Sequence, residues 1–259
     1  MVTEEATEST TSEMALARSA LYGVIASVFR RPDDPLFRTF SSHQEQRALT
    51  EAIGLLGAGG FERMQSAISH LCEAAEATNH DTRMFAFVQL FGHTARGVVP
   101  PYETEYGTGG PFFQPQEMSD IVGFYRAFGL DLDPRRHERL DHMSCEAEFM
   151  CFLCAKEAYA ADAGDASTAQ AVRRAQRLFM RDHLSAFAQT VFANMARQAS
   201  AIWHAAAAEF GSAFIESECA YLDLPLGRTY LSLRQVEDVA VPMACGNCEG
   251  TCGAEAPAD

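Results

Sequence analysis

Apolar side chains recur at intervals of three and four residues along most of this chain. Near the start, Leu21, Val24, Ile25 and Val28 form such a stripe, and residues 10–13 match the Thr-x-x-Glu capping pattern before it. This spacing places the apolar side chains on one face of an α-helix. Further stripes run over residues 43–56, 61–71, 84–91, 118–128, 142–161, 172–179, 187–195 and 202–221. The pattern predicts an all-α fold, a single globular bundle of many helices around one core.

One long segment, residues 92–115, interrupts the helical pattern with many glycines and prolines. It also carries Tyr102 and Tyr106, aromatic side chains that gain from burial, and two carboxylates, Glu103 and Glu105. A long loop with its own aromatic anchors is typical of a packed functional loop. Two interpretations remain open: a loop that covers the bundle, and a recognition loop with an acidic and aromatic lip.

Composition and charge narrow the range of partners. The chain has 259 residues and 47% hydrophobic residues, enough for a full core. Acidic residues outnumber basic ones by 35 to 20, so the formal net charge is -15. This charge argues against nucleic acid and against anionic membranes, and it is compatible with a basic peptide. The chain shows neither a secretory signal nor a membrane span, and we expect a cytoplasmic protein without membrane insertion.

The chain divides into three parts. Residues 1–11 are acidic and are predicted to be disordered, residues 12–235 form the helical domain, and residues 236–259 form a cysteine-containing tail. A connector near residues 130–141, with Asp133 before Pro134, is a candidate hinge. Because a hinge permits exchange of helices between two copies, both a monomer and a dimer remain open.

The tail carries the second candidate site, which is a metal site. Cys245, Cys248 and Cys252 follow the spacing Cys-x-x-Cys-x-x-x-Cys, which suits zinc or an iron–sulfur cluster. A fourth ligand could come from Cys219 or from a partner. Unligated thiols and a regulatory disulfide are the alternatives. The remaining cysteines lie on helical patterns, where free thiols act as small apolar residues: Cys72, Cys145, Cys151 and Cys154.

Catalysis finds little support in the sequence. Glu103, Glu105, Asp141 and His142 are residue types that serve in acid–base chemistry. No nucleophile elbow and no phosphate-binding loop accompanies them. We therefore expect a protein that is not an enzyme. Asp141 has two other interpretations, as the cap of the following helix or as part of a peptide-binding groove.

Three short motifs, taken in order, carry a family resemblance. Leu90-Phe91-Gly92 is followed by Pro100-Pro101-Tyr102-Glu103 and then by Glu138-Arg139-Leu140-Asp141-His142. Over roughly Met14 to Leu222 the chain resembles the TorD/DmsD/NarJ family of cytoplasmic chaperones for molybdenum enzymes. It departs from the family pattern where Arg139 and His93 stand in place of prolines.

The resemblance implies a function and a set of site residues. It implies binding of the twin-arginine signal at the N-terminus of an apo molybdenum or tungsten oxidoreductase, until cofactor insertion and before export. Apolar residues would hold the signal's apolar run, carboxylates would face its arginines, and His142 would adjust this contact with pH. The implied residues are Leu90, Phe91, Tyr102, Glu103, Glu105, Phe124, Tyr125, Glu138, Asp141 and His142. The competing function is a small metal- or iron–sulfur-binding protein that uses the tail cysteines.

Overall fold

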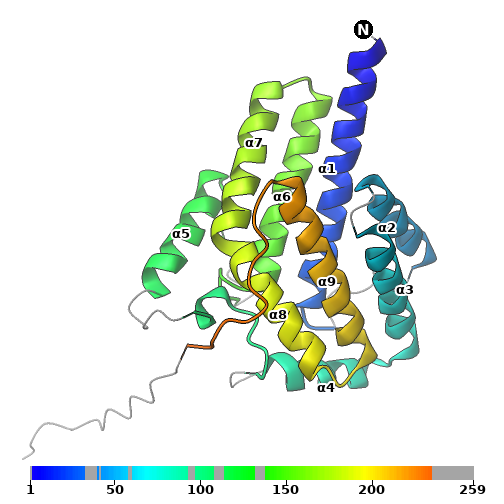
Figure 1. Cartoon of the computed structure of the whole chain (residues 1–259), viewed down its shortest axis with the longest axis vertical. Helices are drawn as coiled ribbons and strands as arrows, with labels where there is room; N and C mark the ends of the chain where they lie inside the picture. The colour runs from blue at the N-terminus through cyan, green and yellow to red at the C-terminus, as the bar shows by residue number, and fades with distance from the viewer. Residues whose placement is uncertain are drawn as a thin grey trace, which may run out of the picture.

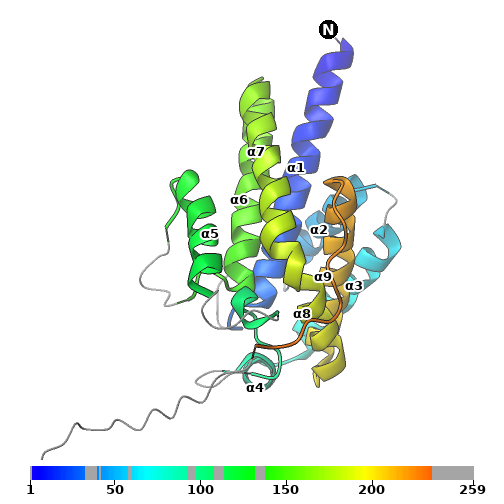
Figure 2. The same ribbon diagram turned by 60° about the vertical axis from the view of Figure 1, so that its left-hand side comes forward.

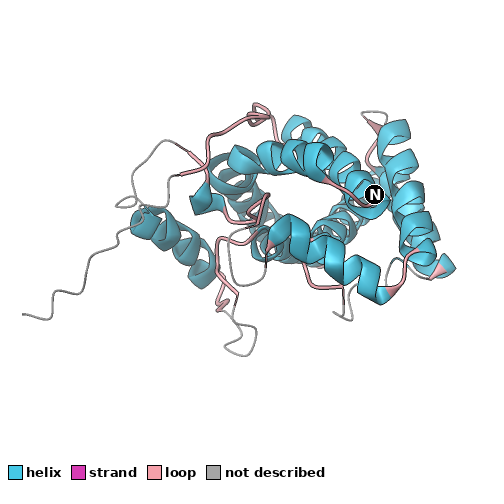
Figure 3. Cartoon of the chain, turned by 90° about the horizontal axis from the view of Figure 1, so that it is seen from below, coloured by secondary structure: helices cyan, strands magenta, loops and turns pink. Residues whose placement is uncertain are grey.

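The chain folds as a bundle of α-helices (Figures 1 and 3). The structure is a computed structural model that describes residues 2–32, 40, 42–57, 60–92, 97–107, 114–131 and 138–234. In these ranges no strand occurs, and isolated bridges pair Tyr102 with His142 and Tyr106 with Leu233. The predicted all-α fold is confirmed.

The helices follow the predicted stripes closely. In chain order they are α1 (Val2–Val28), α2 (His43–Leu55), α3 (Phe61–Ala77), α4 (His80–Phe91), α5 (Gln114–Ala127), α6 (Met143–Asp162), α7 (Ala166–Phe179), α8 (Ser185–Gln198) and α9 (Ile202–Tyr221). A 3₁₀ turn, Glu103–Glu105, lies in the loop between α4 and α5. Helix α1 begins at Val2, ahead of the capping pattern at residues 10–13. The division into a disordered start, a helical domain and a tail stays a prediction.

The helices form a central bundle with a flank on either side. Helices α1, α6 and α7 stand side by side, while α8 and α9 pack against each other in the lower half of the view (Figures 1 and 2). Helix α3 packs on α9, and α2 lies against α1 and α3. On the opposite flank, contacts between aromatic rings join α5 to the bundle. The ring centroid of Tyr125 lies 4.8 Å from that of Phe149 in α6, and the ring centroid of Phe124 lies 5.3 Å from that of Phe179 in α7.

A buried ionic network ties four of these helices together. Arg18 of α1 is fully buried and donates to both carboxylate oxygens of Glu218 in α9, at 2.8 and 2.7 Å. It also donates to Glu157 of α6 at 3.3 Å, and Arg173 of α7 supplies a second cation to Glu157. Tyr22 adds a hydroxyl donor to Glu218. Buried charges are tolerated when they are paired in this way.

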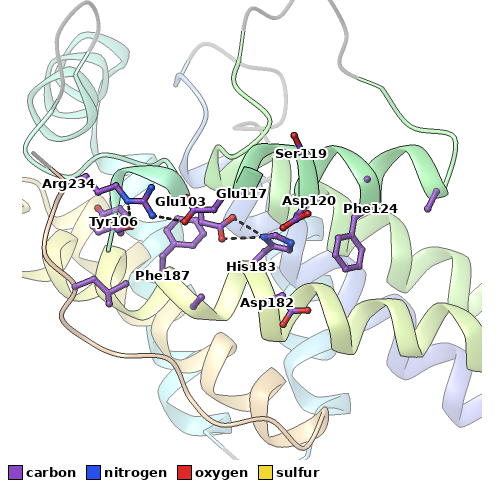
Figure 4. A pocket seen from close by; sticks show the side chains of 14 residues that line it. Glu103, Tyr106, Glu117, Ser119, Asp120, Phe124, Asp182, His183, Phe187 and Arg234 are labelled. Atoms are coloured by element: carbon purple, nitrogen blue, oxygen red, sulfur yellow. Dashed lines mark hydrogen bonds and ion pairs between the residues drawn. The ribbon is translucent and has the colours of Figure 1, made fainter. Parts of the chain in front are cut away.

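Helices α7 and α8 are one continuous rod, although the sequence suggested two separate helices. A π-helical turn, Met180–Leu184, joins them. Such a turn inserts an extra residue into a helix and often marks a functional site. Here it presents His183 toward α5, as Figure 4 shows, and Asp182 also lines the pocket.

Several expectations from the sequence fall on other parts of the chain. The tail cysteines Cys245, Cys248 and Cys252, and residues 132–137 of the candidate hinge, lie outside the described residues. Within the described ranges, no helix has the length and apolar character that a bilayer crossing requires. In those same ranges, no group of three or more His, Cys, Asp and Glu side chains is placed to hold a metal ion. Burial raises the pKa of the Cys72 and Cys219 thiols to about 11, which keeps both in the neutral form.

Candidate binding site

The second and third motifs of the sequence lie side by side. The backbone N–H of Glu103 donates to the Asp141 carbonyl at 2.9 Å, and the N–H of Met143 donates to the Pro101 carbonyl at 2.8 Å. Between these two bonds, Tyr102 and His142 form an antiparallel bridge. The pairing fixes the 3₁₀ turn Glu103–Glu105 against the start of α6, so residues far apart in the sequence share one site.

Arg139, the residue that departs from the family pattern, is the centre of this junction. Its guanidinium donates to both oxygens of Asp141, at 3.0 and 2.7 Å, and to Glu105 at 3.3 Å. It also stacks over the Tyr102 ring at 4.4 Å. Asp141 is fully buried, and it accepts further hydrogen bonds from the backbone N–H and the hydroxyl of Thr104. Arg139 of this chain therefore already binds the Asp141 carboxylate, which the sequence analysis assigned to an arginine of the client.

His142, not Asp141, caps helix α6. Its Nδ1 accepts a hydrogen bond from the backbone N–H of Ser144 at 3.1 Å. Burial, followed by the positive charges of Arg30 and Arg139, lowers the pKa of His142 to about 3. The ring is therefore neutral at physiological pH and does not provide the expected adjustment with pH. The nearby Tyr102 hydroxyl donates to Glu138 at 3.2 Å.

Three other residues from the sequence-based set belong to the core. Leu90 is 3% exposed, and Phe91 and Tyr125 are each 6% exposed. Phe91 packs against Phe29, and the Tyr125 hydroxyl donates to the Leu140 carbonyl at 3.0 Å. These side chains are packed in the core and do not form an open binding surface.

A pocket of about 720 Å³ opens beside the junction, between α5 and the rod of α7 and α8 (Figure 4). It is lined by Glu103, Tyr106, Glu117, Ser119, Asp120, Gly123, Phe124, Ala127, Asp182, His183, Ala186, Phe187, Leu231 and Arg234. Of the ten residues suggested by the sequence, the pocket wall includes Glu103 and Phe124. The rings of Phe124 and Phe187 form apolar parts of the wall, while carboxylates come from both sides.

Inside the pocket, His183 and Glu103 form a largely buried pair. The two side chains are 6% and 13% exposed, and Nδ1 of His183 lies 3.2 Å from a Glu103 carboxylate oxygen. The imidazole is held between the rings of Phe124 and Phe179, with centroids 5.4 and 5.1 Å away. This packing fixes His183 and directs it at Glu103.

Glu146 of α6 lies behind Glu103 and is completely buried. Its two oxygens accept no hydrogen bond from the described residues. Burial, and next the neighbouring Glu103 carboxylate, raises the pKa of Glu146 well above its usual range. A carboxyl group in this setting stays protonated because desolvation and a like charge both oppose ionisation. Burial therefore favours the neutral form of Glu146.

The rim of the pocket is acidic on both sides. Asp120 projects from α5 and accepts from the amide of Gln116 at 3.1 Å, while Asp182 projects from the π-helical turn and pairs with Arg181. Glu117 pairs with Arg234 at 2.7 Å. Carboxylates on both sides of an apolar wall can bind a segment that is both basic and apolar.

Sequence reasoning missed most of this lining. Glu117, Asp120, Asp182, His183 and Arg234 come from three separate segments, and no spacing rule relates them. The available signal was the polar run Arg181-Asp182-His183 within an apolar helical stretch, between Phe179 and Leu184.

Comparison with known proteins gives two matches. Residues 61–193, just over half of the chain, match the family model described as nitrate reductase delta subunit. Over 104 residues the chain is 32% identical to the perchlorate reductase assembly chaperone protein of Dechloromonas aromatica (strain RCB). That match covers 40% of this chain and 46% of the relative, so it spans about half the length of the relative. Together with the motifs, these matches confirm the resemblance, and the chain belongs to the nitrate reductase delta subunit family, of the TorD/NarJ type.

Proposed function

We propose that this protein is an assembly chaperone that binds the N-terminal signal region of an apo molybdenum or tungsten oxidoreductase. It acts in the cytoplasm, holds the client's catalytic subunit until the cofactor is inserted, and performs no catalysis itself. Membership of the family supports this role, and so does the name of the relative, which describes an assembly chaperone for a reductase.

The observation that carries the proposal is the combination of chemistries in the pocket beside α5. A twin-arginine signal joins two guanidinium groups to an apolar run. Asp120, Asp182 and Glu103 offer carboxylates, and the rings of Phe124 and Phe187 offer apolar surface. The net charge of -15 steers a cationic peptide toward the protein as a whole.

A binding titration tests the proposal. The probe is a synthetic peptide with two adjacent arginines followed by an apolar stretch, measured by calorimetry at two salt concentrations. Asp120→Asn should weaken binding by about tenfold and reduce its salt dependence, because one charge-assisted contact is lost. Phe124→Ala should also weaken binding, but with little change in salt dependence, because it removes apolar contact.

The matched control is Glu209→Gln, which replaces a carboxylate by an amide of the same size, as Asp120→Asn does. Glu209 is exposed on α9 and does not line the pocket, so this substitution removes one negative charge from the protein without changing the pocket. It should leave the affinity within about twofold, since one distant surface charge is screened by salt. Equal affinities for the wild type, Asp120→Asn and Phe124→Ala would show that the peptide binds elsewhere or that the proposed function is wrong.

A further inference from the structure

The segment that follows α9 does not leave the protein but runs back across it as an extended strap, residues 224–234. It runs along α8 toward the pocket (Figure 1), where the hydroxyl of Thr190 donates to the Arg228 carbonyl at 2.8 Å. Gly227 lies so close to Ser185 that a Cβ atom there would be 1.9 Å from the Ser185 carbonyl oxygen. The close approach, which only glycine permits, shows that the strap is seated on α8 along a defined path.

The end of the strap is bound at the pocket like an added strand. The N–H of Gly107 donates to the Ser232 carbonyl at 2.9 Å, and the N–H of Arg234 donates to the Glu105 carbonyl at 2.8 Å. Tyr106 and Leu233 form the antiparallel bridge between them. Pairing of an extended segment with exposed backbone groups is a common mode of peptide recognition.

The side chains of the strap supply the chemistry expected of a client. Leu231 lines the pocket, and the Arg234 guanidinium donates to Glu117 at 2.7 Å and to the Tyr106 carbonyl at 3.1 Å. The Arg234 side chain is only 10% exposed. The second carboxylate oxygen of Glu117 is buried without a hydrogen-bond partner among the described residues, so this carboxylate has unused capacity for a guanidinium.

We propose that residues 231–234 are an internal ligand of the pocket, which a basic and apolar client peptide must displace before it binds fully. The inference rests on the proposed function, because it assigns an arginine subsite at Glu117 and Tyr106 to the same pocket. A guanidinium from the client and the one from Arg234 compete for Glu117. Being part of the same chain, the strap competes at a high effective concentration, and the apparent affinity falls with the fraction of open pocket.

Several side chains of the strap are exposed to solvent, as expected of a segment that another peptide can displace. Tyr230 is 73% exposed, Leu226 46% and Leu233 38%, so three large apolar side chains of the strap stay in solvent, while Leu224 and Leu231 are partly buried against the core. The end of the strap, Ser232 to Arg234, is held by polar contacts to Glu105, Tyr106, Gly107 and Glu117. A segment with few buried apolar contacts opens at a lower free energy than the core. A fixed wall would instead be expected to bury its apolar side chains.

Arg234→Gln tests the inference in the full-length chain. Loss of the charged contact to Glu117 opens the strap and frees the carboxylate, so the arginine-containing probe peptide should bind several-fold to about tenfold more tightly. Arg228→Gln is the matched control, since Arg228 is exposed on the same strap and carries the same charge. It should leave the affinity within about twofold.

Three other results are distinguishable. Unchanged or weaker binding by Arg234→Gln, with normal binding by the wild type, overturns the internal ligand and leaves the proposed function standing. Failure of the wild type and both variants to bind the peptide overturns both proposals together. Equal gains for Arg234→Gln and Arg228→Gln overturn the subsite, because net charge then explains the effect.

Hydrogen exchange on the wild type gives a second readout that does not depend on how the variants fold. Saturating peptide should speed exchange at the amides of Gly107 and Arg234, which the strap pairing protects. The amides in the middle of α6 should stay unchanged. Exchange that slows at Gly107 and Arg234 on peptide binding would overturn displacement, since the strap would then remain in place beside the peptide.

Discussion

At the scale of single residues, the carboxylate of Asp141 is surrounded by donors from Arg139 and Thr104 and is shielded from solvent. Asp141→Asn keeps the shape and removes the charge, so it should lower the free energy of unfolding by about 1.5–3 kcal/mol. Chemical denaturation measures this loss. Asp223→Asn, at an exposed position, should change the stability by less than about 0.5 kcal/mol. An Asp141→Asn protein that is fully stable yet binds peptide poorly would show direct contact with the client.

His204 makes a separate prediction about pH. The ring is buried against Phe91, its Nε2 has no hydrogen-bond partner among the described residues, and burial lowers its pKa to about 4. The unfolded chain takes up a proton near pH 6.5, which the folded chain resists down to about pH 4. The stability contributed by the neutral ring is therefore complete above about pH 6.5 and is lost as the pH falls toward 4.

His204→Leu should remove this loss. Relative to wild type, its free energy of unfolding should improve by about 1 kcal/mol for each pH unit between pH 6 and pH 4.5. His142 contributes equally to both proteins, so its own acid sensitivity cancels in the difference. Denaturant titrations at several pH values measure it, with exposed His70→Leu as the control for the change of residue type. A difference that does not vary with pH would contradict the prediction.

The residues of the site were only partly predictable from the sequence. Glu103 was found through a family motif and Phe124 among the apolar residues that the resemblance implied, and both line the pocket. Asp120 and His183 were not, because helices separated by many residues bring them together. The role of Asp141 was also hidden, since the sequence does not reveal that Arg139 folds back onto it.

At the scale of helices, the boundaries were largely encoded by local pattern. Residues 202–221 were predicted as one helix, and α9 spans Ile202–Tyr221. The π-helical turn between α7 and α8 was not predicted, because the apolar residues on either side keep ordinary helical spacing. Its form depends on packing against α5 and α6, which is a property of the assembled bundle.

The network around Arg18 makes a prediction about how helices are held together. Arg18→Met should lower the free energy of unfolding by about 3–5 kcal/mol, because Glu218 is left buried without its cation. The double variant Arg18→Met/Glu218→Gln should recover part of the loss, since the uncompensated charge is gone. Arg63→Met breaks an exposed pair with Glu216 and should cost no more than about 1 kcal/mol. Equal losses for Arg18→Met and Arg63→Met, measured by denaturation, would contradict this account.

At the scale of the whole molecule, the tail remains a separate prediction. The spacing of Cys245, Cys248 and Cys252 predicts bound zinc or iron in protein purified without oxygen, measured by elemental analysis. Cys248→Ser should abolish the bound metal and leave the helical circular dichroism spectrum unchanged. Cys72→Ser, at a buried site in α3, is the control that keeps all three tail thiols. Wild-type protein without stoichiometric metal would contradict the metal site.

The pairing of Gly107 with Ser232 joins an early part of the chain to a late one, and this has a consequence for synthesis. At about 5–20 residues per second, a ribosome reaches Leu231 on the order of ten seconds after Gly107. In the last part of that interval, after Gln198 has been added, α5, the π-helical turn and α8 are all translated, while residues 231–234 of the strap are not. A nascent chain therefore passes through a period in which the pocket has no internal competitor, and a client peptide nearby at that moment meets its most receptive form.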